Sequence, residues 1–290
     1  MTYDICKIKQ QFAQQGYIAD EELATTLGLM QSLERPLLVE GEAGVGKTEI
    51  AKALAGVMDC LLIRLQCFDG LDTNAAVYEW NYTRQLISIK LHEASNQRTD
   101  IDVFSEEFLM ERPLLQSIRQ EQSAVLLVDE IDRADEAFEA YLLELLSDFQ
   151  ISVPELGTIK AKSKPRVVLT SNGTRELSDA LRRRCLYHYI DYPDKRKELA
   201  IINSRLPGIQ QKLAGQIVSF VQQLRQLELL KRPGVAETLD WAAVLAGMGI
   251  EDLKKDVNTV ITTRGCFLKT RDDFEQVDRE MVDELFKKSA

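Results

Sequence analysis

The sequence predicts an α/β domain with a parallel sheet, followed by a second domain made of helices. Short apolar runs alternate with segments of helical periodicity over about two thirds of the chain, as in parallel α/β folds. After residue 192 the strand signals stop and only helical patterns remain. The length of 290 residues suits one large or two ordinary domains, at roughly 100 to 200 residues per domain.

Apolar runs supply the candidate strands of a five-stranded parallel sheet with helices on both faces. They are bounded by turn-forming or polar residues and have lengths typical of buried strands. Residues 135–149 place apolar side chains at spacings of three and four, which predicts a helix packed against the sheet. The strand candidates are residues 36–40, 61–66, 124–129, 166–171 and 187–191.

Two stretches interrupt this scheme, near residues 72–94 and 150–162. In the first, Ile87, Ile89 and Leu91 alternate with polar residues, which predicts an extended segment. In the second, residues 151–159 hold apolar positions on either side of a turn at Gly157, which predicts a short hairpin. Both stretches are therefore interpreted as inserts in the α/β domain.

The domain boundary is predicted near Pro193, which gives an α/β domain of residues 1–192 and a small all-helical domain of residues 193–290. Helices are expected over residues 213–230 and 237–245. The tail, residues 272–290, mixes charged and apolar residues and suits an amphipathic helix packed on the second domain. A tail mobile in solution is the alternative.

Composition excludes several classes of protein. Lys and Arg number 36 against 46 for Asp and Glu, a net charge of −10, which counts against a protein held to nucleic acid by phosphate contacts. The five cysteines form no CxxC pair and the two histidines lie far apart in sequence, so neither a zinc site nor a disulfide framework is predicted.

No targeting or membrane-spanning segment is expected. The first residues, Met-Thr-Tyr-Asp-Ile-Cys-Lys, lack a basic segment followed by an apolar one. No stretch approaches the roughly 20 apolar residues that cross a bilayer. We therefore expect a cytoplasmic protein that does not enter a membrane.

A phosphate-binding loop follows the first candidate strand. Residues 41–48 have two glycines separated by four residues and followed by Lys47 and Thr48, and a predicted helix continues to residue 58. In such loops backbone N–H groups and the helix N-terminus face the phosphates. Lys47 would reach the β- and γ-phosphates, and the Thr48 hydroxyl would bind Mg²⁺. A glycine-rich turn without a ligand is the alternative. The residues expected to bind ATP are Gly41, Glu42, Ala43, Gly44, Val45, Gly46, Lys47, Thr48 and Glu49.

Two carboxylates end the third candidate strand. Asp129 would hold Mg²⁺ through its water shell, and Glu130 would orient and polarise the water that attacks the γ-phosphate. Adjacent acids are also common at helix N-termini, which is the alternative for this pair. A water-activating glutamate favours hydrolysis over transfer to an acceptor, and no Asn-Lys-x-Asp guanine motif occurs, so a GTPase is not expected.

The chain resembles AAA+ ATPases, and among them the MoxR family. Beyond the loop and the strand before Glu130, the matching segments are residues 131–134, 150–155, 169–172 and 177–185, so that the resemblance covers about two thirds of the chain. Three further segments resemble the branch of CoxD-like maturation chaperones, namely residues 63–67, 78–82 and 233–238.

The resemblance assigns further residues to the site. Asn172 is similar to the sensor 1 residue, which hydrogen-bonds the γ-phosphate or the attacking water; an Asx turn is the alternative. Arg184 falls at the position of the family's arginine finger, which enters the nucleotide site of a neighbouring subunit, and Arg183 is the second candidate. The alternative is that these arginines form a solvated basic face. The sensor 2 arginine is replaced by Ala236, and Lys231 or Arg232 would have to substitute for it.

The inserts also have counterparts in the family. Residues 78–82 resemble an insert that faces the axial pore of ring-shaped relatives. Trp80 and Tyr82 either grip a peptide there or pack the insert onto the body of the domain. The hairpin at residues 151–159 resembles the pre-sensor insertion.

The resemblance implies a Mg²⁺-dependent ATPase that forms a homo-oligomeric, hexameric ring and remodels a protein client. Maturation of a metalloenzyme or metal centre is the implied task, with a partner that contains a von Willebrand factor A domain. A nucleic-acid motor or loader is the alternative, opposed by the net charge of −10 and by the absence of a recognisable DNA-binding module after Pro193. A small-molecule kinase is opposed by Glu130 and by the arginine cluster.

Overall fold

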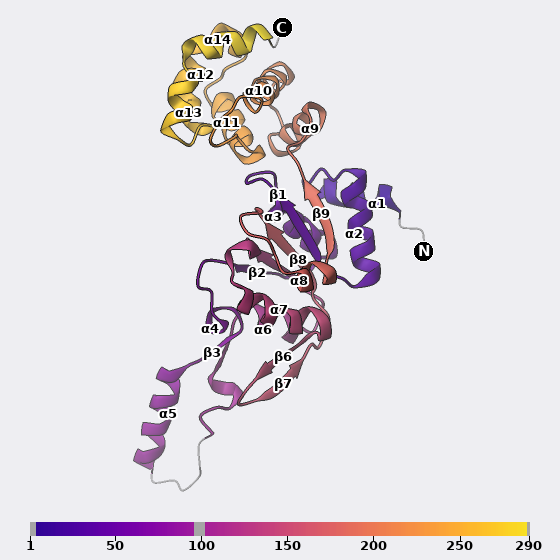
Figure 1. Cartoon of the computed structure of the whole chain (residues 1–290), viewed down its shortest axis with the longest axis vertical. Coiled ribbons are helices and arrows are strands. Elements are labelled where there is room, and N and C mark those ends of the chain that lie inside the picture. The colour runs from indigo at the N-terminus through magenta and orange to yellow at the C-terminus, as the bar shows by residue number, and fades with distance from the viewer. Residues whose placement is uncertain (1–3, 96–101, 289–290) are drawn as a thin grey trace. The chain divides into compact units, whose positions relative to one another are not determined.

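The structure is a computed structural model that describes residues 4–95 and 102–288 and divides into two compact units (Figure 1). The first unit comprises Met1–Ile5, Glu22–Glu40 and Ala51–His188. The second comprises Cys6–Glu21, Gly41–Ile50 and Tyr189–Ala290. The first three residues of the N-terminus, where no targeting segment was expected, lie outside the described residues. The boundary near Pro193 stays a prediction.

Helices and strands alternate along the first two thirds of the chain. The strands are β1 (Leu37–Gly41), β2 (Leu62–Gln66), β3 (Tyr78–Trp80), β4 (Leu109–Glu111), β5 (Val125–Asp129), β6 (Gln150–Val153), β7 (Gly157–Lys160), β8 (Arg166–Ser171) and β9 (Leu186–Ile190). The α-helices up to β9 are α1 (Ile5–Gln14), α2 (Glu21–Leu33), α3 (Lys47–Met58), α4 (Thr73–Ala76), α5 (Tyr82–Ser95), α6 (Pro113–Arg119), α7 (Glu136–Asp148) and α8 (Asp179–Arg184). Short 3₁₀ helices are η1 (Glu106–Phe108) and η2 (Ile131–Arg133).

The predicted five-stranded parallel sheet is confirmed. Its order is β2-β5-β8-β1-β9, with parallel pairing of β2 to β5, β5 to β8 and β8 to β1. In this register Val168 of β8 lies between Leu127 of β5 on one side and Leu37 of β1 on the other. Each of the five strands begins and ends within one residue of its predicted position. The carboxyl ends of β1, β5 and β8 therefore lie at one edge of the sheet.

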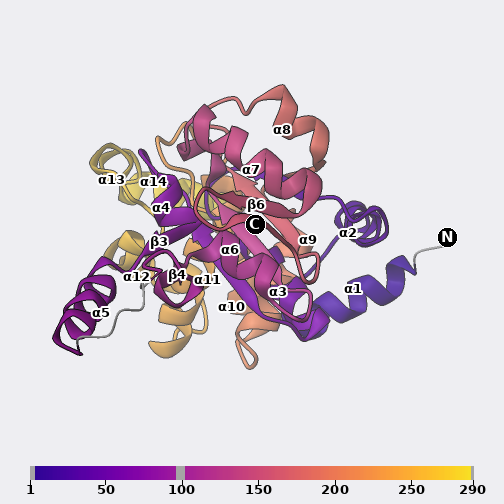
Figure 2. The same ribbon diagram turned by 90° about the horizontal axis from the view of Figure 1, so that it is seen from below.

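Both faces of the sheet are covered. Leu126 and Val128 of β5 lie in one apolar cluster together with Phe138 of α7, and all are buried. Because strand side chains alternate between faces, Val125 and Leu127 point to the opposite face, and both are also fully buried. The predicted helix over residues 135–149 is α7, which begins after Asp135, whose carboxylate accepts the N–H of Phe138. Figure 2 shows α7 beside β6, with which it is in contact.

The two inserts have different outcomes. The hairpin is confirmed, because β6 and β7 pair antiparallel and Ile151 faces Ile159. The extended segment around residues 87–91 is wrong, because Tyr82–Ser95 forms helix α5. The Asn81 side chain accepts the N–H of Arg84, which caps this helix. The alternation of apolar and polar residues gave the wrong prediction because Ile87 and Leu91 are exposed. Their spacing in the sequence therefore does not reflect a buried face of a strand or helix.

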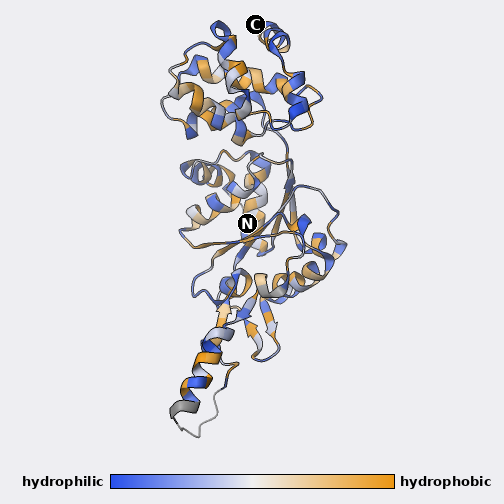
Figure 3. Ribbon diagram, turned by 90° about the vertical axis from the view of Figure 1, so that its left-hand side faces the viewer, coloured by the Kyte–Doolittle hydropathy of each residue, from blue (hydrophilic) through white to orange (hydrophobic). Residues whose placement is uncertain are grey.

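The second unit contains the helices that follow β9. They are α9 (Lys195–Arg205), α10 (Gln211–Leu224), α11 (Val235–Gly247), η3 (Leu253–Lys255), α12 (Val257–Thr263), η4 (Arg264–Cys266), α13 (Arg271–Gln276) and α14 (Arg279–Lys288). Their buried apolar side chains form one cluster that includes Phe220, Trp241 and Phe267. Figure 3 shows hydrophobic positions in orange among hydrophilic ones along these helices.

Two predicted helices of this region are revised. The helix predicted over residues 213–230 ends at Leu224, after which the N–H groups of Gln226 and Leu227 bond to the carbonyl oxygens of Gln223 and Leu224 in tighter turns. Further along, the N–H groups of Leu230 and Lys231 are bonded to the Asp273 carboxylate at 2.8 and 3.1 Å. The tail is helical and packed on this unit, as predicted, but it is divided into α13 and α14. Residues 289–290 lie outside the described residues.

Candidate nucleotide site

The phosphate-binding loop connects the end of β1 to the start of α3. Gly44 and Gly46 have φ angles of +77° and +97°, which glycine adopts without strain. A Cβ at Gly41 would lie 2.2 Å from the carbonyl oxygen of Ile190, so no side chain fits there. These glycines allow a loop of backbone N–H groups that leads into a helix N-terminus, which is suited to phosphate.

Side chains of the loop are arranged around this backbone. Lys47 is buried, and its Nζ donates to the carbonyl oxygens of Gly41 and Glu42 at 2.7 Å each. Thr48 lies in the first turn of α3, and Val45 is buried. The Glu49 carboxylate pairs with Arg205 of α9 at 2.7 Å, which ties the start of α3 to a helix of the same unit.

The N-terminus of α11 contacts the loop directly. The N–H of Val235 donates to the carbonyl oxygen of Gly44 at 2.9 Å. A Cβ at Gly234 would lie 2.8 Å from the Cα of Gly44, so the two backbones touch. Glu237 accepts the N–H of Gly234 at 3.0 Å, which gives this N–H at the start of α11 a partner. Ala236, at the position of the missing sensor 2 arginine, is exposed.

A network of buried polar groups supports this helix end. The Arg225 guanidinium donates to both oxygens of Glu198 at 2.7 and 2.8 Å and to the carbonyl oxygen of Pro233 at 2.7 Å. Thr238 donates to Glu198 at 3.0 Å. Arg225 and Glu198 are almost completely buried, so the charges are compensated by each other and by these hydrogen bonds. Arg225, Glu198 and Gly234 received no role in the sequence analysis, because their contacts connect segments distant in sequence.

Tyr17 lies close to Gly46 of the loop. Its ring carbon Cε2 is 4.0 Å from the position of a Cβ at Gly46. Burial, with Asp20 and Glu49 adding to it, raises the pKa of the Tyr17 hydroxyl above its ordinary value. No motif marks Tyr17, so only the structure reveals this contact.

The predicted catalytic carboxylates lie in the first unit, at the end of β5. Asp129 is buried; its Oδ1 accepts the Thr170 hydroxyl at 2.5 Å, and its Oδ2 accepts Arg64 at 2.6 and 3.1 Å. The Thr170 oxygen in turn accepts the N–H of Glu130 at 2.9 Å. Thr170 therefore positions both carboxylate residues from the neighbouring strand β8.

Glu130 has an unusual backbone conformation. Its φ and ψ are 56° and 50°, a left-handed conformation that costs a non-glycine residue about 1 kcal/mol or more. Glu130 occupies the N-cap position of η2, and its side chain makes no capping hydrogen bond there. Its carboxylate pairs with Arg133 at 2.7 Å and remains partly exposed.

Asn172 follows β8 in a turn that is held by Asp132. The two carboxylate oxygens of Asp132 accept the N–H of Asn172 at 3.2 Å each, and Oδ2 also accepts the N–H and hydroxyl of Thr174 at 3.0 and 2.7 Å. Burial acts to raise the pKa of Asp132, but the hydrogen bonds from Thr174 and Asn172 outweigh it and lower the pKa below its ordinary value. The turn is thus capped by Asp132 and not by Asn172.

The arginine cluster ends helix α8, which begins after Ser178. Arg182 lies 3.8 Å from the Glu40 carboxylate. The Nε of Arg184 donates to the Ser147 hydroxyl of α7 at 2.6 Å. Arg183 and Arg184 are both exposed.

The structure decides between the two interpretations of Trp80. It is 5% exposed and packs edge-on against Tyr78 and Phe104, so it belongs to the core of the first unit. Tyr82, in contrast, is 63% exposed at the start of α5.

The residues present fit the groups that the sequence analysis predicted. The loop and Lys47 suit a triphosphate. Mg²⁺ in phosphate sites is held by one or two protein oxygens together with phosphates and waters, and the Thr48 hydroxyl and the Asp129 carboxylate are each a ligand of this type in their own unit. Within residues 4–95 and 102–288, no group of three or more His, Cys, Asp or Glu side chains is placed so that it could hold a metal ion.

The sheet order, the loop after β1 and the carboxylates after β5 define a P-loop nucleotide-binding protein. Residues 36–185 match the profile of the AAA domain (dynein-related subfamily), and the chain belongs to this family. ATP binding and hydrolysis are therefore supported at the level of the family, and its members are usually oligomeric. The MoxR and CoxD-like levels of the resemblance stay predictions.

Individual proteins are similar over much of the chain. The gas vesicle ATPase GvpN of Haloferax mediterranei is 26% identical over 242 residues, which are 78% of this chain and 66% of that protein. A protein of unassigned function from Staphylococcus epidermidis is 25% identical over 76% of this chain and 78% of its own length. A solved structure from Cytophaga hutchinsonii, provisionally assigned as an ATPase, is 15% identical with a TM-score of 0.51 over 98% of this chain and 93% of its own, a likeness in fold.

None of the helices in the described part of the chain is both long and apolar enough to cross a membrane.

Proposed function

We propose that the chain is a Mg²⁺-dependent ATPase in which Glu130 activates the attacking water. The observation that supports this most directly is the hydrogen-bonded unit of Thr170, Asp129 and Glu130 at the carboxyl end of β5. Only β8 separates β5 from β1, the strand that leads into the phosphate-binding loop. Ligands of open α/β sheets bind at this edge.

Each residue has a distinct part in the proposed mechanism. The backbone of residues 41–46 and Lys47 bind the phosphates, while Thr48 and Asp129 hold Mg²⁺, which supplies charge neutralisation when bound. Glu130 accepts the proton of the attacking water. Asn172 orients that water or the γ-phosphate, and the Asp132 carboxylate fixes the turn in which Asn172 lies.

At the level of the assembly, we propose a hexameric ring in which Arg184 or Arg183 acts in the nucleotide site of a neighbouring subunit. Residues 193–290 form a lid that is coupled to the loop through Gly234 and Gly44. The ring remodels a protein client together with a von Willebrand factor A domain partner. Maturation of a metal centre is the task that the CoxD-like segments favour. The arginines at the end of α8 are exposed, as a residue acting in trans must be.

Hydrolysis is tested with two substitutions that should fail in different ways. Lys47→Ala removes the cation from the phosphate loop, so ATP binding and turnover should both be lost. Glu130→Gln keeps Lys47, Thr48 and Asp129, so ATP should remain bound while turnover falls by about 10² or more, the range expected for loss of a general base. Phosphate release and binding of labelled ATP are measured with and without Mg²⁺.

Glu136→Gln is the matched control, because Glu136 is an exposed carboxylate in the first turn of α7. It should hydrolyse ATP like the wild type. Near wild-type turnover by Glu130→Gln would exclude Glu130 as the base, and phosphorylation of an acceptor without phosphate release would make the protein a kinase.

A further inference from the structure

Arg35 is bonded to the backbone of the segment that ends in the arginine cluster. Its Nε donates to the carbonyl oxygen of Arg184 at 3.1 Å. Its Nη2 donates to the carbonyl oxygen of Arg183 and, at 3.5 Å, to that of Cys185. One guanidinium thus contacts three successive carbonyl groups, 148 to 150 residues away in sequence.

These carbonyl groups need a partner. The last four C=O groups of a helix have no acceptor role within the helix and bear its partial negative charge. In α8 they belong to the last turn and to the cap residue Cys185, which is already extended. A planar guanidinium can donate to several of them at once and also favours the negative end of the helix.

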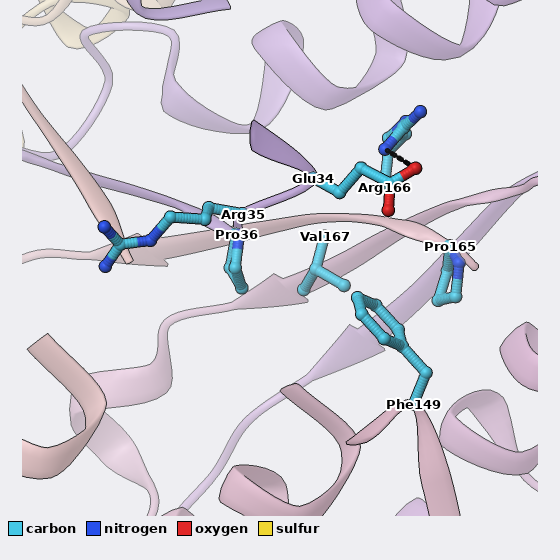
Figure 4. Close-up of a pocket in the computed structure, with 7 residues that line it drawn as sticks. All are labelled: Glu34, Arg35, Pro36, Phe149, Pro165, Arg166 and Val167. Carbon is cyan, nitrogen blue, oxygen red and sulfur yellow. Dashed lines mark ion pairs between the residues drawn. The ribbon is translucent and has the colours of Figure 1, made fainter. Parts of the chain in front are cut away.

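The contact is part of a fixed junction between two segments. Next to Arg35, the carbonyl oxygen of Pro36 accepts the N–H of Leu186 at 2.7 Å. Figure 4 shows the Arg35 side chain extending away from Glu34 and Arg166, which pair with one another at 3.9 Å. The guanidinium of Arg35 is therefore directed to α8 and not to the charged side chains near it.

We propose that Arg35 is a positioning residue for the arginine finger: it holds the last turn of α8 so that Arg184 or Arg183 reaches the neighbouring subunit's nucleotide. This inference rests on the proposed function, which assigns the finger. The side chains of these arginines make further contacts, between Arg182 and Glu40 and between Arg184 and both the Ser147 hydroxyl and the carbonyl oxygen of Ala180. Side-chain contacts of an exposed finger must be released when it acts, whereas the backbone contact with Arg35 can persist.

Arg35→Ala should reduce kcat for ATP hydrolysis by about 10 to 10²-fold, because a displacement of about 1 Å in a catalytic group has a cost of this order. The affinity for ATP should not change, because Arg35 contacts the segment that carries the finger and does not contact the phosphate-binding loop of its own subunit. Lys164→Ala is the control, because it removes a cation from the same surface, where Lys164 pairs with Glu34 at 2.6 Å, without touching α8. It should leave kcat unchanged.

Mixing subunits separates positioning from a general structural role. Lys47→Ala subunits lack a working phosphate loop but keep the finger, whereas Arg35→Ala subunits keep the loop but have a misplaced finger. At mixed interfaces an intact finger meets an intact loop, so the mixture should hydrolyse ATP faster than the sum of the two variants alone. A merely unstable Arg35→Ala protein would not be rescued by its partner.

Arg35→Lys provides a second test if the alanine variant does not fold. It keeps the charge but not the planar fork, so kcat should lie between wild type and Arg35→Ala with an unchanged melting temperature. Unchanged kcat in both variants, or a loss that mixing does not restore, would overturn the inference. The proposed function fails separately, if Arg184→Ala and Arg183→Ala both leave kcat unchanged or if the wild type hydrolyses no ATP.

Discussion

Thr170 connects the two carboxylate residues of the candidate site through a single hydroxyl group. It donates to Asp129 and accepts from the backbone of Glu130, and it is completely buried. A buried hydroxyl that both donates and accepts has little freedom to rotate. The hydroxyl thereby helps to hold the left-handed backbone of Glu130 in place.

Asp132 has a comparable role for Asn172, and its contribution should depend on pH. Asp132→Asn replaces a carboxylate acceptor of three hydrogen-bond donors with an amide, so we expect a loss of about 1.5–3 kcal/mol in the free energy of unfolding at neutral pH. Because the native pKa of Asp132 is lowered, the stabilisation is complete above the ordinary value of about 3.9 and decreases as the pH falls through the native pKa.

Urea unfolding of both proteins between neutral pH and the acid range measures this difference. Asp148→Asn, at an exposed aspartate of the same unit, should change stability by less than about 0.5 kcal/mol. A constant difference between wild type and Asp132→Asn at all pH values would contradict the carboxylate's role.

Residues marked by local context could be predicted from the sequence. Lys47 stands in a spaced glycine motif, and Asp129 and Glu130 end an unbroken apolar strand. Thr170, Arg64 and Arg35 could not be predicted, because they act through the pairing of β8 with β5, of β2 with β5, and through a contact with α8. No residue beside them in sequence indicates these partners.

At the level of elements, the contact of α11 with the phosphate loop offers a coupling route that needs no sensor 2 arginine. The route is made of backbone, from Gly44 to Gly234 and Val235, and is supported from behind by Arg225 and Glu198. A change of loop conformation on nucleotide binding would therefore act on the first turn of α11.

Gly234→Ala tests this route. The added Cβ would lie 2.8 and 2.9 Å from the Cα and C atoms of Gly44, closer than real Cβ contacts, so either the loop or α11 must shift. We expect ATP affinity to fall by about tenfold, equivalent to about 1.4 kcal/mol, within the usual 1–3 kcal/mol of overpacking. Isothermal titration with a slowly hydrolysed ATP analogue measures the affinity.

Gly247→Ala is the control for that experiment. Gly247 ends the same helix, and a Cβ there would meet no atom within 4 Å. It should bind the analogue like the wild type. Equal affinities for all three proteins would show that the loop tolerates a shift of α11, and the coupling route would be rejected.

Elements with a buried face were predicted best. The central strands β1, β5 and β8 are covered on both sides, so their apolar runs are continuous and their ends are clear, whereas the edge strands β2 and β9 alternate buried and exposed residues. Helix α5 was missed because its apolar residues are exposed, among them Leu86, Ile87 and Leu91, and exposed positions do not report a helical period. The end of α10 was missed because apolar residues continue beyond Leu224, at Leu227, Leu229 and Leu230, although the chain there has left the helix.

At the scale of the whole molecule, the net charge of −10 and the exposed apolar residues of α5 favour a protein client over nucleic acid. Phosphate contacts require cations, and any residual binding to duplex DNA should disappear as salt rises. Tyr82, Leu86, Ile87 and Leu91 are each more than half exposed, so helix α5 presents apolar side chains that a protein client could contact.

We therefore expect an unfolded model protein such as casein to stimulate steady-state ATP hydrolysis, and duplex or single-stranded DNA at physiological salt not to do so. Leu91→Ser should abolish this stimulation and leave basal hydrolysis unchanged, because Leu91 is 67% exposed and distant in sequence from the catalytic motifs. Leu33→Ser, at a residue 53% exposed on α2, is the matched control and should respond to casein like the wild type. Stimulation by DNA and not by casein would contradict the client-remodelling proposal and favour a nucleic-acid motor. ATP hydrolysis would then be coupled to DNA binding, although the chain has a net negative charge.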